Sequence, residues 1–77
     1  MTFTIQISGT LRGIIDHLPQ RAVVETTSPM TLKRLATDIG IPPILVVIAF
    51  VNGRKINLDE RLDEDAEIYF MGPVAGG

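Results

Sequence analysis

The sequence predicts an α+β domain in which one helix packs on one face of a mixed sheet of about five strands, in the order β-β-α-β-β-β. Three observations predict it: alternating apolar residues near both ends of the chain, one apolar stripe at helical spacing, and an Asn-Gly pair between two predicted strands. With 77 residues, 45% of them hydrophobic, the chain can bury one small core and has no room for a deep cleft. A self-sufficient enzyme is therefore not expected.

The first two strands are predicted from different patterns. In residues 3–8, Phe3, Ile5 and Ile7 alternate with polar residues, which is typical of a strand with one buried face. Residues 21–27 (RAVVETT) are rich in β-branched side chains, which favour strands. Residues 9–19 are predicted as a connection between glycine and proline residues, part of which packs on the core.

One helix is predicted to begin after Thr31, a residue type that caps helix N-termini, with Ser28-Pro29 as an alternative start. Gly40 favours the left-handed turn that ends a helix, and Pro42-Pro43 prevents its continuation. The stripe that lines one helical face consists of Leu32, Leu35, Ala36 and Ile39.

The run Ile44 to Val51 is apolar throughout, which predicts a strand buried on both faces. Asn52-Gly53 follows, and both residues tolerate the positive φ of a two-residue hairpin turn. Residues 54–58 are therefore the predicted return strand.

The final strand is predicted over residues 66–71, with Ala66, Ile68 and Phe70 on one face. A polar turn with Leu62 as its apolar anchor comes before it. If the first and last strands lie side by side in the centre and the helix crosses one face, the arrangement is a ubiquitin-like β-grasp. Residues 1–71 form the predicted β-grasp domain, and residues 72–77 a flexible tail.

Composition excludes several kinds of function. The chain has no Cys and one His, His17, so thiolate chemistry, disulfides and a His-based metal site are not expected. A net charge of −2 argues against nucleic-acid binding. The longest apolar run is far shorter than the roughly 20 residues of a membrane span. The N-terminus has no signal-peptide pattern, so we expect a cytoplasmic protein without membrane attachment.

Most of the carboxylates lie in one acidic turn, between Asp59 and Glu67. Their spacing does not match a calcium-binding loop. A solvated turn is the simple interpretation. The alternative is an acidic rim that steers a basic partner toward the adjacent tail.

The C-terminal tail, residues 72–77, is the part of the sequence that indicates a chemical function. Its six residues are small and uncharged, and two terminal glycines leave a backbone without Cβ atoms that can pass through a narrow channel. The group delivered is the Gly77 carboxylate, a poor electrophile that reacts after activation, typically as an acyl-adenylate. Nothing in the chain resembles an ATP site, so a partner would activate it. Attack by sulfur would then give a thiocarboxylate, and attack by an amine an amide.

Over essentially its whole length the sequence resembles the ThiS/MoaD family of ubiquitin-like sulfur carrier proteins. The resemblance rests on Val51-Asn-Gly53, the Leu62 turn, Glu67-Ile-Tyr-Phe70, Gly40-Ile-Pro-Pro43 and the ending Gly72-Pro-Val-Ala-Gly-Gly77. The ending and Leu11-Arg12 resemble the MoaD branch, the small subunits of molybdopterin synthase. Glu64-Asp65 and Gly72-Pro73 stand where the family often has Gly-Asp and Pro-Pro, which leaves the pathway branch open.

The resemblance implies that an E1-like enzyme of the MoeB or ThiF type adenylates Gly77, using ATP and a sulfur donor that this chain does not bind. The thiocarboxylate would then enter the large synthase subunit, MoaE, and give its sulfur to the molybdenum or tungsten cofactor precursor. The predicted partner-binding residues are Phe70, Gly72, Pro73, Val74, Ala75 and Gly76. Phe70 is expected in an apolar contact beside the tail, rimmed by the acidic turn, or alternatively in the core. A carrier for thiazole, tRNA or amino-acid sulfur, a ubiquitin-like modifier joined through Gly77, and a plain interaction module are the other interpretations.

Overall fold

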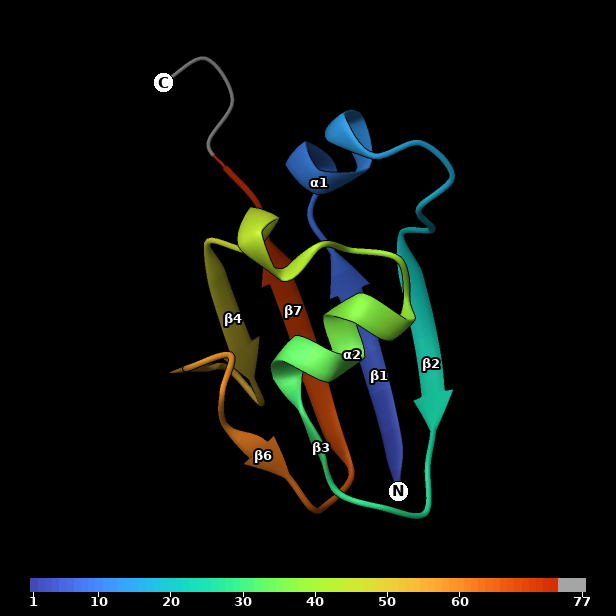
Figure 1. Cartoon of the computed structure of the whole chain (residues 1–77), viewed down its shortest axis with the longest axis vertical. Coiled ribbons are helices and arrows are strands. Elements are labelled where there is room, and N and C mark those ends of the chain that lie inside the picture. The colour runs from blue at the N-terminus through green and yellow to red at the C-terminus, as the bar shows by residue number, and fades with distance from the viewer. Residues whose placement is uncertain (74–77) are drawn as a thin grey trace.

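The computed structural model describes residues 1–73 and contains one five-stranded sheet, one two-stranded sheet and three short helices (Figure 1). The strands are β1 (Thr2–Ile7), β2 (Arg21–Glu25), β3 (Met30–Thr31), β4 (Ile48–Val51), β5 (Arg54–Ile56), β6 (Arg61–Leu62) and β7 (Ala66–Met71). The helices are α1 (Gly9–Ile14), α2 (Leu32–Asp38) and the 3-10 helix η1 (Pro43–Leu45). The large sheet has the order β2-β1-β7-β4-β5, and β3 pairs with β6.

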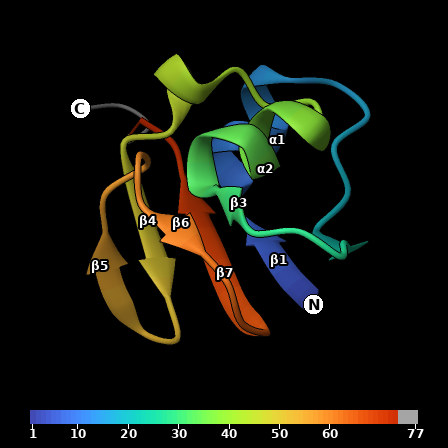
Figure 2. The ribbon, with the colours of Figure 1, turned by 60° about the horizontal axis from the view of Figure 1, so that its bottom comes forward.

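The first and last strands form the centre of the large sheet, as the sequence predicts. β1 and β7 run parallel, with Phe3 opposite Ala66 at one end and Ile7 opposite Phe70 at the other. The antiparallel strands β2 and β4 flank them, and α2 crosses one face of this sheet (Figure 2). The β-grasp prediction is confirmed. The expected order β-β-α-β-β-β holds for the large sheet and α2, and the structure adds α1, η1 and the β3–β6 pair.

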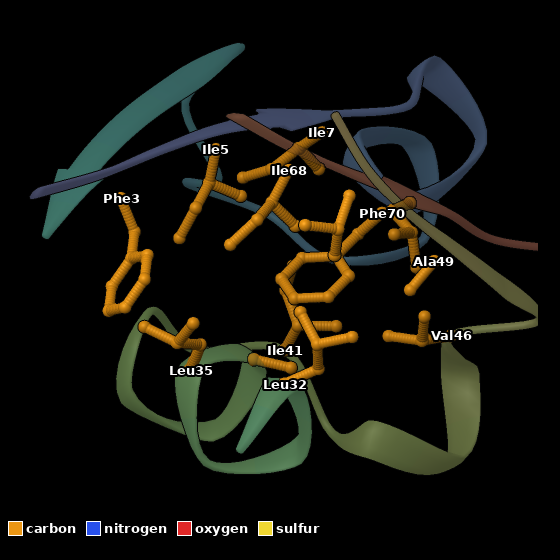
Figure 3. Packing of buried hydrophobic residues seen from close by; sticks show 13 residues of the cluster. Phe3, Ile5, Ile7, Leu32, Leu35, Ile41, Val46, Ala49, Ile68 and Phe70 are labelled. Atoms are coloured by element: carbon orange, nitrogen blue, oxygen red, sulfur yellow. The ribbon is translucent and has the colours of Figure 1, made fainter. Parts of the chain in front are cut away.

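The core lies between the sheet and α2. Period-two alternation turns Phe3, Ile5 and Ile7 of β1 and Ile68 and Phe70 of β7 toward the helix, and all are buried. Figure 3 shows these side chains facing those from the helical side. The helical side contributes the fully buried residues Leu32, Leu35, Ala36 and Ile41.

Both ends of α2 follow the predicted capping chemistry. The Arg34 N–H donates to Thr31 Oγ1 at 3.1 Å, so Thr31 is the N-cap. Gly40 has φ +95°, and the Ile41 N–H donates to the Ala36 carbonyl at 2.8 Å. This is the Schellman arrangement, in which the left-handed residue lets the chain turn back and satisfy the last carbonyls.

The segment 44–51 is not the continuous strand that the sequence predicts. Residues 43–45 form η1, and Ile44 is 90% exposed. The proline pair before it fixes φ and removes two N–H donors, which favours a short 3-10 turn over a paired strand. β4 alternates between buried and partly exposed residues, because within residues 1–73 only one face of the sheet is covered by a helix.

The hairpin after β4 is confirmed. Asn52 and Gly53 have φ of 51° and 82°, and Val51 lies opposite Arg54 across the turn. Two consecutive positive φ values match the right-handed twist of the strands they join.

Candidate functional site

The tail leaves the domain at the end of β7, and its first residue is anchored. The Gly72 N–H donates to Ser8 Oγ at 3.1 Å, and the Ser8 N–H donates to the Phe70 carbonyl at 3.0 Å. These bonds continue the β1–β7 contact past the last paired residues. Gly72 is buried and Pro73 is exposed. The predicted boundary before residue 72 is therefore wrong by one residue, because Gly72 is part of the folded domain.

Ser8 joins the tail root to α1. Its hydroxyl accepts from the Gly72 N–H and, at 3.4 Å, from the Leu11 N–H, so one side chain holds the tail root and caps the helix. Thr10 Oγ1 lies 3.0 Å from the same hydroxyl. Ser8 is 6% exposed, and burial of its hydroxyl is tolerated because these partners satisfy it. This cap is the local reason that part of the predicted connection 9–19 folds as a helix.

A side chain at position 72 would collide with α1. A Cβ there would lie 2.7 Å from Leu11 Cγ and 2.8 Å from Leu11 Cδ2, well inside van der Waals contact. Leu11 is fully buried and is held by the core. Position 72 therefore requires glycine, because its backbone lies too close to the Leu11 side chain to leave room for a Cβ atom.

Phe70 does not lie on the surface. Its side chain is fully buried, and Figure 3 shows it in the core among sheet and helix residues. The expectation that Phe70 forms a surface contact with a partner is wrong for this reason, and its alternative, a core residue, is what the structure has. Because side chains alternate along β7, the neighbours Tyr69 and Met71 face outward instead. Tyr69 packs edge-on against Phe50 of β4, with ring centroids 6.4 Å apart.

Exposed apolar side chains surround the point where the tail leaves. On one side Ile14 of α1 is 54% exposed and lines a groove that also includes Tyr69, Met71 and Pro73. On the other side Val47 is 58% exposed, and its N–H donates to the Met71 carbonyl at 2.8 Å. We define the tail-root patch as Ile14, Val47, Tyr69, Met71 and Pro73. Figure 1 shows α1 and the turn before β4 at the same end of the sheet as the end of β7.

The end of the acidic turn that leads into β7 lies at the opposite end of the sheet from the tail. Asp65 Oδ1 accepts from the Thr2 N–H at 2.7 Å, beside the start of β1. The six residues of β7 separate this end of the turn from Gly72 by roughly 20 Å. The expectation of an acidic rim beside the tail is therefore wrong for Asp65 and its neighbours, whereas Asp59 at the other end of the turn lines a hollow together with Val47. Leu62 is the anchor that the sequence predicts, because it packs against the core from the β3–β6 pair.

A model described as the ThiS family matches residues 5–77. The chain belongs to the ThiS family. The match covers the whole described domain from the middle of β1, and it also includes the tail.

Two solved structures share the β-grasp fold with this ThiS-family chain. SAMP1 from Haloferax volcanii aligns with a TM-score of 0.69 and 18% identity over 100% of both chains. A Pyrococcus furiosus protein provisionally assigned as molybdopterin converting factor, subunit 1, aligns with a TM-score of 0.67 and 16% identity, over 96% of this chain and 99% of its own. At such identities the likeness shows the fold alone. No curated protein matches the sequence.

The predicted site residues of this ThiS-family protein divide into three groups. Phe70 and Gly72 are buried, and Pro73 is exposed at the start of the tail. Val74, Ala75, Gly76 and Gly77 lie outside the described residues. Within residues 1–73, no group of three or more His, Asp or Glu side chains is placed to hold a metal ion. None of the helices described there has the length and apolar character needed to cross a bilayer.

The sequence patterns did not single out Ser8, Met71 or the α1 side of the patch as parts of the site. Alternation along residues 66–71 already indicated Met71, since a residue that follows the buried Phe70 must face outward. The Ser8 contact with Gly72 joins residues 64 apart in the chain, and no local pattern predicts it.

Proposed function

We propose that this protein is a sulfur carrier whose Gly77 carboxylate is adenylated by an E1-like enzyme and converted to a thiocarboxylate, for use in molybdenum or tungsten cofactor synthesis. The observation that carries the proposal is the ThiS-family match, which extends through the terminal Gly-Gly. The chain acts as a carrier or synthase subunit and is not itself the enzyme. We place it in the cytoplasm.

The proposed chemistry uses the partner for activation and this chain for delivery. Attack of the Gly77 carboxylate on the α-phosphate of ATP gives the acyl-adenylate and releases pyrophosphate. A sulfur donor then displaces AMP and leaves the thiocarboxylate. ATP and the sulfur donor belong to the partner enzyme, of the MoeB or ThiF type. A large subunit of the MoaE type is the proposed acceptor in the next step.

The anchored root supports this delivery role. Gly72 fixes one end of the tail, and the five residues beyond it can reach roughly 17 Å when extended. Because a displacement of about 1 Å at a reacting atom can cost a hundredfold in rate, a fixed starting point for the tail is useful. We propose that the tail-root patch contacts the surface of the partner enzyme. Pro73, Val74, Ala75 and Gly76 would then lie inside the channel that leads to the partner's active site. Exposed apolar side chains gathered around one point are typical of such contacts.

The test is intact-mass analysis after incubation with the E1-like enzyme from the same cell, ATP and a sulfur donor. The wild-type chain should gain the mass change of one oxygen replaced by sulfur. Deletion of Gly77, or addition of one residue after it, should abolish this change while circular dichroism stays the same. Gly76→Ala should be milder but still harmful, because it adds a Cβ in the channel.

Normal thiocarboxylate formation by the Gly77 deletion would overturn the carrier proposal. The modifier alternative predicts another result, since protein isolated from its native cell would then occur as conjugates with Gly-Gly remnants on lysines. A carrier for thiazole, tRNA or amino-acid sulfur predicts the same mass change as our proposal. It would be recognised by transfer of labelled sulfur to those products instead of the pterin.

A further inference from the structure

The outer edge of β2 is free of pairing partners within the described part of the chain. β2 lies at one margin of the sheet order β2-β1-β7-β4-β5, and Figure 1 shows it at one side of the molecule. Its inner edge pairs with β1 over five residues, from Arg21 to Glu25. Such an edge presents unpaired N–H and C=O groups to any strand that can match them.

Two hydrogen bonds fix which backbone groups point outward. The Ile7 N–H donates to the Gln20 carbonyl at 3.1 Å, and the Thr26 N–H donates to the Met1 carbonyl at 3.0 Å. Residues that exchange such bonds alternate along an antiparallel pair, so Ala22 and Val24 also direct their backbone groups toward β1. The groups of the residues between them therefore point away from the sheet. These residues are Arg21, Val23 and Glu25, and no proline interrupts the segment.

The same three residues are self-complementary about Val23. If two copies of β2 pair antiparallel with Val23 on the twofold axis, Val23 faces its own copy, and Arg21 of each copy faces Glu25 of the other. All three pairs then fall on the outward backbone groups, so every pair can exchange two hydrogen bonds. Their side chains are exposed on the uncovered face of the sheet, Val23 by 56%. Cross-strand pairs of opposite charge stabilise a sheet, whereas like charges in the same positions destabilise it.

We propose that the β2 edge binds a second copy of this chain and forms a twofold dimer with one continuous sheet. Charged residues on an edge strand usually prevent such pairing, but here the twofold axis places opposite charges across from each other. The other edge is different, because the charged residues of β5, Arg54 and Lys55, are both cationic and a second copy would bring like charges together. The contact involves one strand from each copy, so the dimer is weak and depends on protein concentration.

This inference does not rest on the proposed sulfur chemistry. β1 separates β2 from β7, so the dimer leaves the tail-root patch accessible. A carrier could then meet its partner enzyme either as a single chain or as a pair.

Sedimentation velocity over a wide range of protein concentrations tests the proposal with charge exchanges. Arg21→Glu and Glu25→Arg should each raise the dimer dissociation constant by about tenfold or more, because both place like charges opposite one another twice in each dimer. The double variant Arg21→Glu/Glu25→Arg should restore wild-type dimerisation. An equal mixture of the two single variants should form mixed dimers, since each then supplies the charge that the other lacks.

Lys55→Glu on the opposite edge is the matched control and should leave the dissociation constant unchanged. Circular dichroism of each variant confirms that the fold is intact. A protein that stays monomeric at the highest concentrations would overturn the proposal. A dimer unaffected by both single exchanges would also overturn it, because another surface would then be responsible.

Discussion

Gly72→Ala adds one carbon atom where β7 ends against α1, and it should destabilise the domain by about 1–3 kcal/mol, the usual cost of overpacking. The new Cβ would lie 2.7 Å and 2.8 Å from two carbons of Leu11, and 3.2 Å from Thr10 Oγ1. Leu11 cannot move away at low cost, because it is fully buried in the core cluster. The strain should also weaken the bond between the Gly72 N–H and Ser8 Oγ.

A double-mutant cycle isolates the collision. Leu11→Ala alone should cost roughly 2–5 kcal/mol through lost burial and the cavity that remains. It also removes the two carbons that the new Cβ at position 72 would meet. In the double variant this Cβ lies in that cavity. The loss of stability measured for the double variant should therefore be smaller than the sum of the two single-variant losses, by roughly 0.5–3 kcal/mol.

Urea denaturation monitored by circular dichroism gives the free energies of unfolding for this cycle. Gly13→Ala is the control within α1, because a Cβ there meets no atom within 4 Å. It should be neutral or stabilising by up to about 1 kcal/mol, as expected for replacing glycine in a helix. A loss below about 0.5 kcal/mol for Gly72→Ala, or strict additivity with Leu11→Ala, would refute the account of the tail root.

Two further predictions concern the core and the patch. Leu35→Ala should lower the free energy of unfolding by roughly 2–5 kcal/mol in the same assay, because Leu35 is fully buried between α2 and the sheet. A loss under about 0.5 kcal/mol would mean that this helix face is not in the core. Met71→Glu should leave the unfolding free energy nearly unchanged but weaken binding to the E1-like enzyme, measured by calorimetry, by about tenfold or more, because it places a charge in the tail-root patch. Binding as tight as that of the wild type would exclude Met71 from the interface.

Local pattern was enough to predict several elements. The alternation in residues 66–71 predicted β7 with its bounds, because side chains of a strand point to opposite faces in turn. Asn52-Gly53 predicted the hairpin, because few other residue pairs accept two consecutive positive φ values. Thr31 and Gly40 predicted the ends of α2 from capping chemistry.

The sequence did not predict features that depend on distant contacts. The apolar run from Ile44 did not show that Ile44 would be exposed, since such a run is compatible with a buried strand or with a surface patch. The short α1 also escaped detection, because it has only six residues and two of them, Gly9 and Gly13, have low helix propensity.

The sequence by itself determined the elements of the large sheet, the helix on it, and the chemistry of a terminal Gly-Gly. The tertiary structure alone decided that Gly72 is anchored, that Phe70 lies in the core, and that Asp65 of the acidic turn lies far from the tail. The physical reason is the range of the forces involved. Backbone preference and side-chain periodicity act over a few neighbouring residues, whereas the tail root and the acidic turn are placed by contacts between segments more than sixty residues apart, Ser8 with Gly72 and Thr2 with Asp65.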